Sequence, residues 1–222
     1  MSQNTRDRIL NRLKKAGTMT PDMHVELPPL PHAMMDSDEL VQSFILNVTA
    51  AGAEVHHVEQ GQDMSNILTE IIKDTELTRF IVNDDTVFKH LELDIWAAKQ
   101  GLALIRASEF NDRRSYTDAV FDVGTAGFTT VDYAVAESGT LVIGHHQGHA
   151  RLISLAPMIH IVLVRTDQIV PVYDDVIAQG LFNDEGPSQV TWITGPSMTA
   201  DIQATPFKGM HGPKRLVVLL RK

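Results

Sequence analysis

Residues 53–105 read AEVHHVEQGQDMSNILTEIIKDTELTRFIVNDDTVFKHLELDIWAAKQGLALI, and the pattern of this stretch decides the fold class. Three strand-like runs alternate in it with two helix-like runs: 53–58, 64–73, 79–82, 91–99 and 102–105. A helix between two strands allows the chain to cross over and start the next strand in the same direction. The stretch therefore predicts an α/β domain with a largely parallel sheet.

The second half of the chain keeps the strands and loses the helix-length spacing. Apolar runs at 119–124, 139–143 and 159–164 have little sequence between them, which indicates mixed or antiparallel neighbours. The segment between the first two runs contains a short apolar stretch that could be helical. A helix is expected within 170–180, and two further strands are expected at 190–194 and 216–220.

The N-terminal segment is expected to be a small appendage. Ile9, Leu10 and Leu13 share one face of an amphipathic helix over 6–15, and four prolines between 17 and 32 predict an extended connector. Oxygen-bearing side chains from Asp36 onward offer an N-cap for the first core helix. We therefore divide the chain into a helix with a Pro-rich connector, 1–35, and an α/β domain, 36–222.

Composition excludes several classes of function. The formal net charge is −9 in 222 residues, which argues against a nucleic-acid surface. There is no cysteine, so the chain forms no disulfide and holds no zinc or iron–sulfur cluster through cysteine. No stretch has the length and apolarity of a membrane span, and the charged N-terminus is unlike a signal peptide. These features predict a cytoplasmic protein.

Two Gly-Pro turns near the C-terminus bracket an Asp and a His and predict a ligand pocket. The first begins at Gly195, and Ser197 or Thr199 after it can cap a helical turn whose free N–H groups suit an anion. Asp201 either faces a ligand hydroxyl or amine, or is simply a charge at the start of that helix. The second turn, between Gly209 and Pro213, includes Gly212.

His211 lies inside the second turn. It either performs acid–base chemistry or ties its loop to the backbone.

The segment 136–140, AESGT, places Glu137 next to a glycine at the start of a strand. Such a carboxylate can serve as an acyl-transfer nucleophile or a polar anchor, with Ser138, Gly139 and Thr140 beside the ligand. The alternative is that Glu137 accepts hydrogen bonds from a turn.

The segment 144–151, GHHQGHAR, has His145, His146 and His149 at a spacing that resembles metal ligands. Because Gly148 interrupts any helix that would align these rings, we expect an exposed hairpin loop without a metal. Arg151 either meets an anionic ligand or forms an ion pair within the fold, and the second reading is preferred.

Three segments together resemble the lactate-utilization (LUD) domain family, most of all its C-type members. They are AESGTLVI at 136–143, RLISLAPMIHIVLVRTDQIVP at 151–171 and ITGPSMTADIQATPFKGMHGP at 193–213. The resemblance runs from about Leu40 to Lys222. It implies a three-layer α/β/α fold similar to the ribose-5-phosphate isomerase and CoA-transferase group. It also implies a role in oxidising L-lactate to pyruvate beside sibling proteins, one of them an iron–sulfur protein.

The leading hypothesis is a non-redox subunit of this lactate-oxidising system that binds a small anionic or nucleotide-like ligand. Glu137, Asp201 and His211 are the candidate catalytic residues, and the candidate ligand contacts are Ser138, Gly139, Thr140, Gly195, Ser197, Thr199, Gly209 and Gly212. The alternatives are an independent acyl- or CoA-transferase with Glu137 as nucleophile, and a purely scaffolding subunit. Self-association is compatible with the sequence, which identifies no cofactor.

Overall fold

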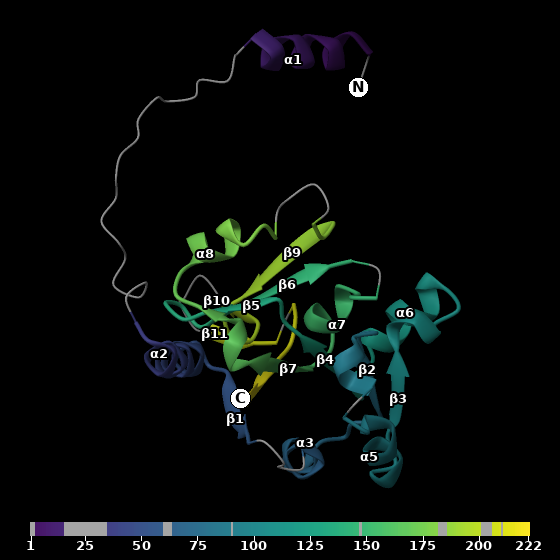
Figure 1. The fold of residues 1–222 in the computed structure, drawn as a ribbon. Helices are drawn as coiled ribbons and strands as arrows, with labels where there is room; N and C mark the ends of the chain where they lie inside the picture. The colour runs from purple at the N-terminus through teal and green to yellow at the C-terminus, as the bar shows by residue number, and fades with distance from the viewer. Residues whose placement is uncertain are drawn as a thin grey trace.

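A six-stranded parallel sheet forms the centre of the molecule (Figure 1), with the strand order β1-β12-β7-β4-β2-β3. The computed structural model describes residues 3–15, 35–59, 64–89, 91–146, 148–181, 186–200, 206–209 and 211–222. The strands of the main sheet are β1 (Glu54–Val58), β2 (Arg79–Val82), β3 (Ala103–Arg106), β4 (Thr125–Thr130), β7 (Ile159–Arg165) and β12 (Arg215–Arg221).

The neighbouring interior strands β7 and β12 are apolar on both faces because both faces are covered. Ile161 and Val217 belong to the core on the first face, whereas Val162 and Val218, one residue further along, belong to the core on the second. Successive side chains of a strand point to opposite faces, so a strand buried on both sides reads as an unbroken apolar run. This explains the sequences of β7 and β12.

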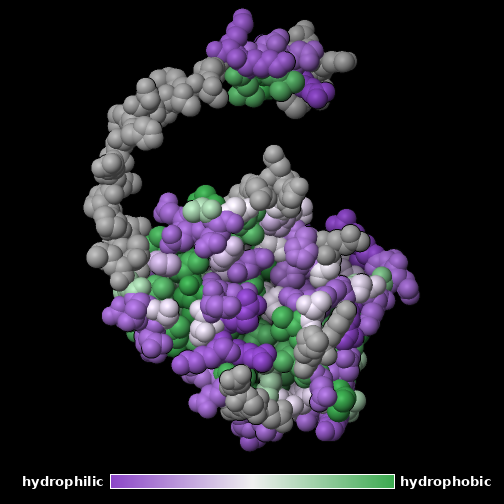
Figure 2. All heavy atoms as spheres, in the orientation of Figure 1, coloured by the Kyte–Doolittle hydropathy of each residue, from purple (hydrophilic) through white to green (hydrophobic). Residues whose placement is uncertain are grey.

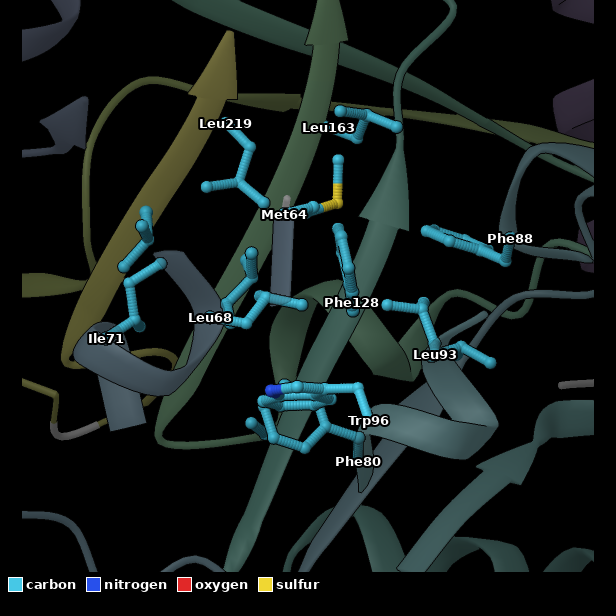
Figure 3. Packing of buried hydrophobic residues seen from close by; sticks show 14 of the residues in the cluster. Met64, Leu68, Ile71, Phe80, Phe88, Leu93, Trp96, Phe128, Leu163 and Leu219 are labelled. Atoms are coloured by element: carbon cyan, nitrogen blue, oxygen red, sulfur yellow. The ribbon is translucent and has the colours of Figure 1, made fainter. Parts of the chain in front are cut away.

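Three helices cover the first face: α3 (Met64–Ile72), α4 (Thr86–Lys89) and α5 (Leu93–Lys99). The ring of Trp96 meets Phe80 edge to face with centroids 5.3 Å apart, and its Nε1–H donates to Thr69 Oγ1 at 2.9 Å. Figure 3 shows these aromatic rings below Phe128 and Leu68 in the same apolar layer. Trp96 is therefore a core residue.

The second face is covered by helices and by a smaller sheet. Helix α2 (Ser37–Ala50) and the four-stranded sheet β8-β5-β6-β9 share one apolar core with the main sheet. The smaller sheet consists of β5 (Tyr133–Val135), β6 (Thr140–His145), β8 (Ile169–Val170) and β9 (Gln189–Ile193). Helices α6 (Arg113–Val120) and α7 (Leu152–Leu155) cover the rest of this face. The remaining described elements are η2 (Ala107–Glu109), η3 (Thr166–Gln168), α8 (Tyr173–Ala178), β10 (Met198–Ala200) and β11 (Pro206–Lys208).

The main sheet thus has helices on both faces, which confirms the predicted three-layer α/β/α fold. Helix α2 begins where the sequence predicts, with Asp36 as N-cap and Glu39 completing a capping box. The expected strand over 119–124 was wrong, because α6 runs through Val120 and β4 begins at Thr125. The apolar stretch after it, which could have been helical, forms β4 and β5.

Helix α1 (Gln3–Lys15) precedes the domain, and its apolar and charged side chains separate to opposite sides (Figure 2). Ile9, Leu10 and Leu13 are exposed on the apolar side. No helix within the described ranges combines the length and the apolarity that crossing a bilayer requires.

Helix α7 approaches the main sheet so closely that β4 has no side chain at the contact. A Cβ atom on Gly127 would lie 2.0 Å from the carbonyl oxygen of Ile153. Backbone cannot yield as a flexible side chain can, so only glycine fits here. The contact fixes where α7 lies on the second face.

Gly127→Ala is expected to lower the free energy of unfolding by about 3 kcal/mol, because α7 must move away from the sheet. The control is Gly101→Ala, where an added Cβ meets nothing within 4 Å and the only penalty comes from φ of +71°. That variant is expected to lose only about 1 kcal/mol. Urea denaturation measures both, and an equal loss in the two variants would contradict the role of the α7 contact.

Candidate functional site

The structure brings the two predicted Gly-Pro turns together. The Ser197 N–H donates to the Pro213 carbonyl at 2.8 Å, and the Gly209 N–H donates to the Ser197 carbonyl at 2.9 Å. The turns enclose a cavity of about 240 Å³, which we call the turn cavity. It is lined by Ser154, Leu155, His160, residues 191–197, residues 211–213 and Leu216.

The turn cavity lies at the amino ends of β7 and β12, on the second face of the main sheet. Pro213 comes just before β12, and His160 is the second residue of β7. Gly195 follows β9, a strand of the smaller antiparallel sheet. The turns therefore do not occupy the carboxyl edge of the parallel strands, where α/β proteins commonly bind ligands.

Gly195 has a structural reason to be glycine. Its φ is +83°, and a Cβ atom there would lie 2.3 Å from the Ala51 carbonyl at the end of α2. Gly139 is held in a similar way, with φ of +67° and a Cβ position 2.2 Å from the Val48 nitrogen. Both predicted ligand contacts thus pack directly on the C-terminal end of α2.

His160 is the polar residue of the turn cavity that the sequence reasoning missed. Its side chain is fully buried, its Nε2 lies 2.9 Å from Thr129 Oγ1, and its Nδ1 has no hydrogen-bond partner among the described residues. Burial, together with the nearby His149, lowers the pKa of His160 to about 3, so the ring is neutral at pH 7. One histidine in the apolar run IHIVLV was the available signal, because a buried polar group needs a partner.

His211 is exposed at the rim of the turn cavity, and Ser197 packs against Gly212 inside it. The helical turn expected after Ser197 was wrong, because Met198–Ala200 is strand β10 and pairs with β11. Thr199 lies in this two-stranded ribbon. Asp201 lies outside the described residues.

Glu137 faces α8. Its Oε1 accepts the backbone N–H of Tyr173, the first residue of that helix, at 3.1 Å. A hydroxyl chain next to Glu137 leads toward the turn cavity: Thr140 Oγ1 lies 2.8 Å from Ser138 Oγ and 2.7 Å from Thr194 Oγ1. Thr194 lines that cavity. Ser138 and Thr140 thus connect the two regions through hydrogen bonds.

The histidine loop after β6 is not the exposed hairpin that we expected. His145 and His149 are buried, and only His146 is exposed. His145 Nε2 lies 2.7 Å from Thr191 Oγ1, and the ring of His149 stacks on that of His146 at a centroid distance of 5.4 Å. The Gly148 carbonyl accepts the Asp84 N–H at 2.9 Å, which ties the loop to the segment after β2. Burial lowers the pKa of His145 and of His149.

Arg151 donates from Nη1 to Gln189 Oε1. None of the ion pairs between described residues involves Arg151, so the predicted ion pair within the fold stays a prediction. The described part of the chain contains no group of three or more His, Asp or Glu side chains arranged to hold a metal ion.

The sequence matches a known protein family. The family model of the LUD domain matches residues 41–220 of the 222. The chain belongs to the LUD domain family. The matched range contains the main sheet, the smaller sheet and both Gly-Pro turns, and it leaves α1 outside.

Several curated relatives of this LUD domain chain carry the name lactate utilization protein C. The proteins from Bacillus pumilus and Deinococcus radiodurans are 35% and 37% identical over 40% and 49% of this chain, which is 39% and 52% of their own length. These two matches thus span about half of each relative or less. The protein from Halalkalibacterium halodurans is 28% identical over 96% of this chain and 92% of its own length.

A solved structure has the same fold. The crystal structure of a DUF162 family protein from Deinococcus radiodurans superposes with a TM-score of 0.61 and 23% identity. The superposition covers 85% of this chain and 99% of the other. This likeness supports the three-layer fold of the LUD domain.

Acid is expected to destabilise this LUD domain through its buried histidines. The His160 pKa is about 3 in the folded protein and about 6.5 in the unfolded chain, so only the unfolded chain takes up a proton between these values. The stabilisation is complete above pH 6.5 and is lost as the pH falls toward 3. Between pH 7 and pH 5, His160 alone is expected to lower the free energy of unfolding by about 2 kcal/mol.

Urea denaturation at both pH values measures this loss in the wild type and in His160→Gln. Between the two pH values, the free energy of unfolding of His160→Gln is expected to fall less than that of the wild type, because the glutamine side chain does not titrate. Part of the decrease remains, because His145 and His149 still contribute to it. His57→Gln, which changes an exposed histidine, serves as control, and its free energy of unfolding should fall as much as that of the wild type. The same loss in His160→Gln as in the wild type would contradict the assignment.

Proposed function

We propose that this protein acts in lactate utilization, as a non-redox subunit of a cytoplasmic system that oxidises L-lactate to pyruvate. The names of its relatives support this setting, including one that aligns over nearly the whole chain. The absence of cysteine supports the non-redox part, since the chain holds no iron–sulfur cluster through cysteine. The electrons are therefore assigned to sibling proteins, one of which carries such clusters.

The turn cavity is the proposed ligand site, and one observation carries it. A buried polar atom without a partner costs free energy, and Nδ1 of His160, a residue that lines the turn cavity, is such an atom among the described residues. If Nε2 accepts the Thr129 hydroxyl, Nδ1 carries the proton and donates to a ligand oxygen. A bound carboxylate supplies that oxygen.

The lining of the turn cavity matches a small carboxylate of the lactate and pyruvate class. No Asp or Glu is among its described lining residues, so an anion meets no carboxylate there. Leu155, Trp192 and Ile193 offer apolar contacts for a methyl group, and Ser197 offers a hydroxyl. A volume of about 240 Å³ suits a ligand of a few heavy atoms.

His211 is proposed to assist at the rim, with Asp201 as its candidate partner.

Calorimetric titration of the full chain with L-lactate and with pyruvate tests this site. Saturable binding is expected for at least one of them, and His211→Ala and Ser197→Ala are each expected to weaken it about tenfold through a lost hydrogen bond to the carboxylate. His57→Ala, which changes another exposed histidine, on β1, is the matched control and should bind normally. Binding that both cavity variants leave unchanged would remove the turn cavity as the site.

The non-redox role predicts that the purified chain does not oxidise L-lactate with an artificial electron acceptor. Adding the cluster-bearing sibling protein from the same host is expected to restore turnover, because the electrons then have a carrier. Turnover by the chain alone, without added flavin or cluster protein, would overturn this role and leave the ligand site to be judged by the titration.

The transferase alternative depends on Glu137 as a nucleophile. Its Oε1 is engaged by the Tyr173 N–H at the start of α8, which favours the reading of Glu137 as a turn acceptor. We therefore rank acyl or CoA transfer below ligand binding in the turn cavity.

A further inference from the structure

A second cavity, of about 380 Å³, lies at the opposite edge of the main sheet. Its walls come from the segment after β2, with Asp84 and Asp85, and from the end of β4, with Thr130 in the strand and Asp132 just after it. The loop after β6 adds His149. We call it the carboxyl-edge cavity. It shares no described lining residue with the turn cavity.

The chain topology makes this position a crevice. After β2 the chain continues through α4 and α5 on the first face, whereas after β4 it continues through β5 and β6 on the second (Figure 1). β2 and β4 are neighbours in the sheet, so the two connections part directly above them. In open α/β sheets a ligand commonly binds outside the carboxyl ends of strands at such a point.

The three carboxylates in this cavity are held by neutral groups. Asp85 accepts from the Val87 N–H at 3.0 Å and from Thr130 Oγ1 at 2.7 Å, which ties the ends of β2 and β4 together. Asp132 accepts the Gly144 N–H at 2.6 Å. Asp84 accepts from Ser108 Oγ at 2.5 Å. No Lys or Arg is among the described lining residues, so the described lining offers these carboxylates neither an ammonium nor a guanidinium group.

His149 adds an independent observation that points to a ligand. Its side chain is 6% exposed, and its Nδ1 lies 2.7 Å from the Gly144 carbonyl, which can only accept, so Nδ1 carries the proton. The Nε2 atom therefore has a lone pair, and it is buried without a hydrogen-bond partner among the described residues. Burial keeps the ring neutral by lowering its pKa.

These groups have one property in common: they accept hydrogen bonds. The carboxylates and His149 Nε2 are all acceptors, and the Thr130 hydroxyl already donates to Asp85. A complementary ligand must donate. A neutral polyol would donate but leave three negative charges uncompensated, and the described residues provide no three-ligand metal arrangement.

We propose that the carboxyl-edge cavity binds a small organic cation through an ammonium group. Its N–H donors meet Asp132, Asp84 and the Nε2 atom of His149, and its charge offsets those of the carboxylates. The volume suits a small metabolite and excludes a macromolecule. This site is independent of the proposed lactate role, since it has its own lining.

The test compares amines with neutral molecules of the same shape. The full chain is titrated by calorimetry with ethanolamine and 1,4-diaminobutane, and in parallel with ethylene glycol, 1,4-butanediol and magnesium chloride. At least one amine is expected to bind saturably and to raise the melting temperature, while its diol counterpart does not. Binding should weaken with added salt, because charge attraction contributes to it.

Two variants locate the binding. Asp132→Asn keeps an oxygen for the Gly144 N–H and removes one charge, and it is expected to weaken amine binding about tenfold. His149→Gln, which removes the Nε2 acceptor, should also weaken it. Asp118→Asn, on the exposed surface of α6, is the matched control and should bind as the wild type does.

The proposal is overturned if neither amine binds, if a diol binds as well as its amine, if magnesium alone binds, or if Asp132→Asn binds normally while its melting temperature matches the wild type. Loss of lactate binding in the turn cavity variants does not bear on it.

Discussion

The close contact between α7 and β4 is the constraint on which both cavities depend. A parallel sheet buried on both faces needs a cover on each, and at Gly127 the cover lies against bare backbone. Helix α7 is only one turn long, yet its position determines where the chain before and after it runs. The loop with His149 precedes it and lines the carboxyl-edge cavity, while Ser154, Leu155 and then His160 line the turn cavity.

The two cavities differ in chemistry because their polar groups differ. The turn cavity has apolar walls and hydroxyl groups around a neutral histidine, and no described carboxylate, which suits a small anion. The carboxyl-edge cavity has three carboxylates around another neutral histidine, which suits a cation. Each of the two histidines has one nitrogen without a partner, and each is kept neutral by burial. His149 contributes to the lowered pKa of His160, so the two rings are electrostatically coupled across the interior.

Much of the fold could be predicted because local pattern and tertiary environment agree. β2, β7 and β12 appear within a residue of their expected positions, since their apolar runs are buried on both faces. The edge strand β1 also lies within a residue of its expected position, although it is only partly buried. The error at 119–124 has a physical cause. Ala119 and Val120 are apolar because α6 buries them against the second face, and a short apolar run does not distinguish a buried helix end from a strand.

The site was only partly accessible from the sequence. The strained turns at Gly195 and Gly209 could be seen, because φ above zero favours glycine. His160 stands out as one histidine in an apolar run, but nothing along the chain shows that it lines a cavity, and the histidine loop could not be known to be buried. Nothing in the sequence distinguishes Asp84, Asp85 and Asp132 from the other carboxylates of the chain. They line one cavity only because β2 and β4 are adjacent in the sheet.

The sequence by itself determined the α/β class, the family and the absence of cysteine chemistry, because periodicity, motif order and composition are properties of the chain. The tertiary structure alone decided that the Gly-Pro turns lie at the amino edge of the sheet, and that His145, His149 and His160 are buried. Strand order and burial are set by contacts between residues distant in sequence, and no local pattern encodes which strand end faces which.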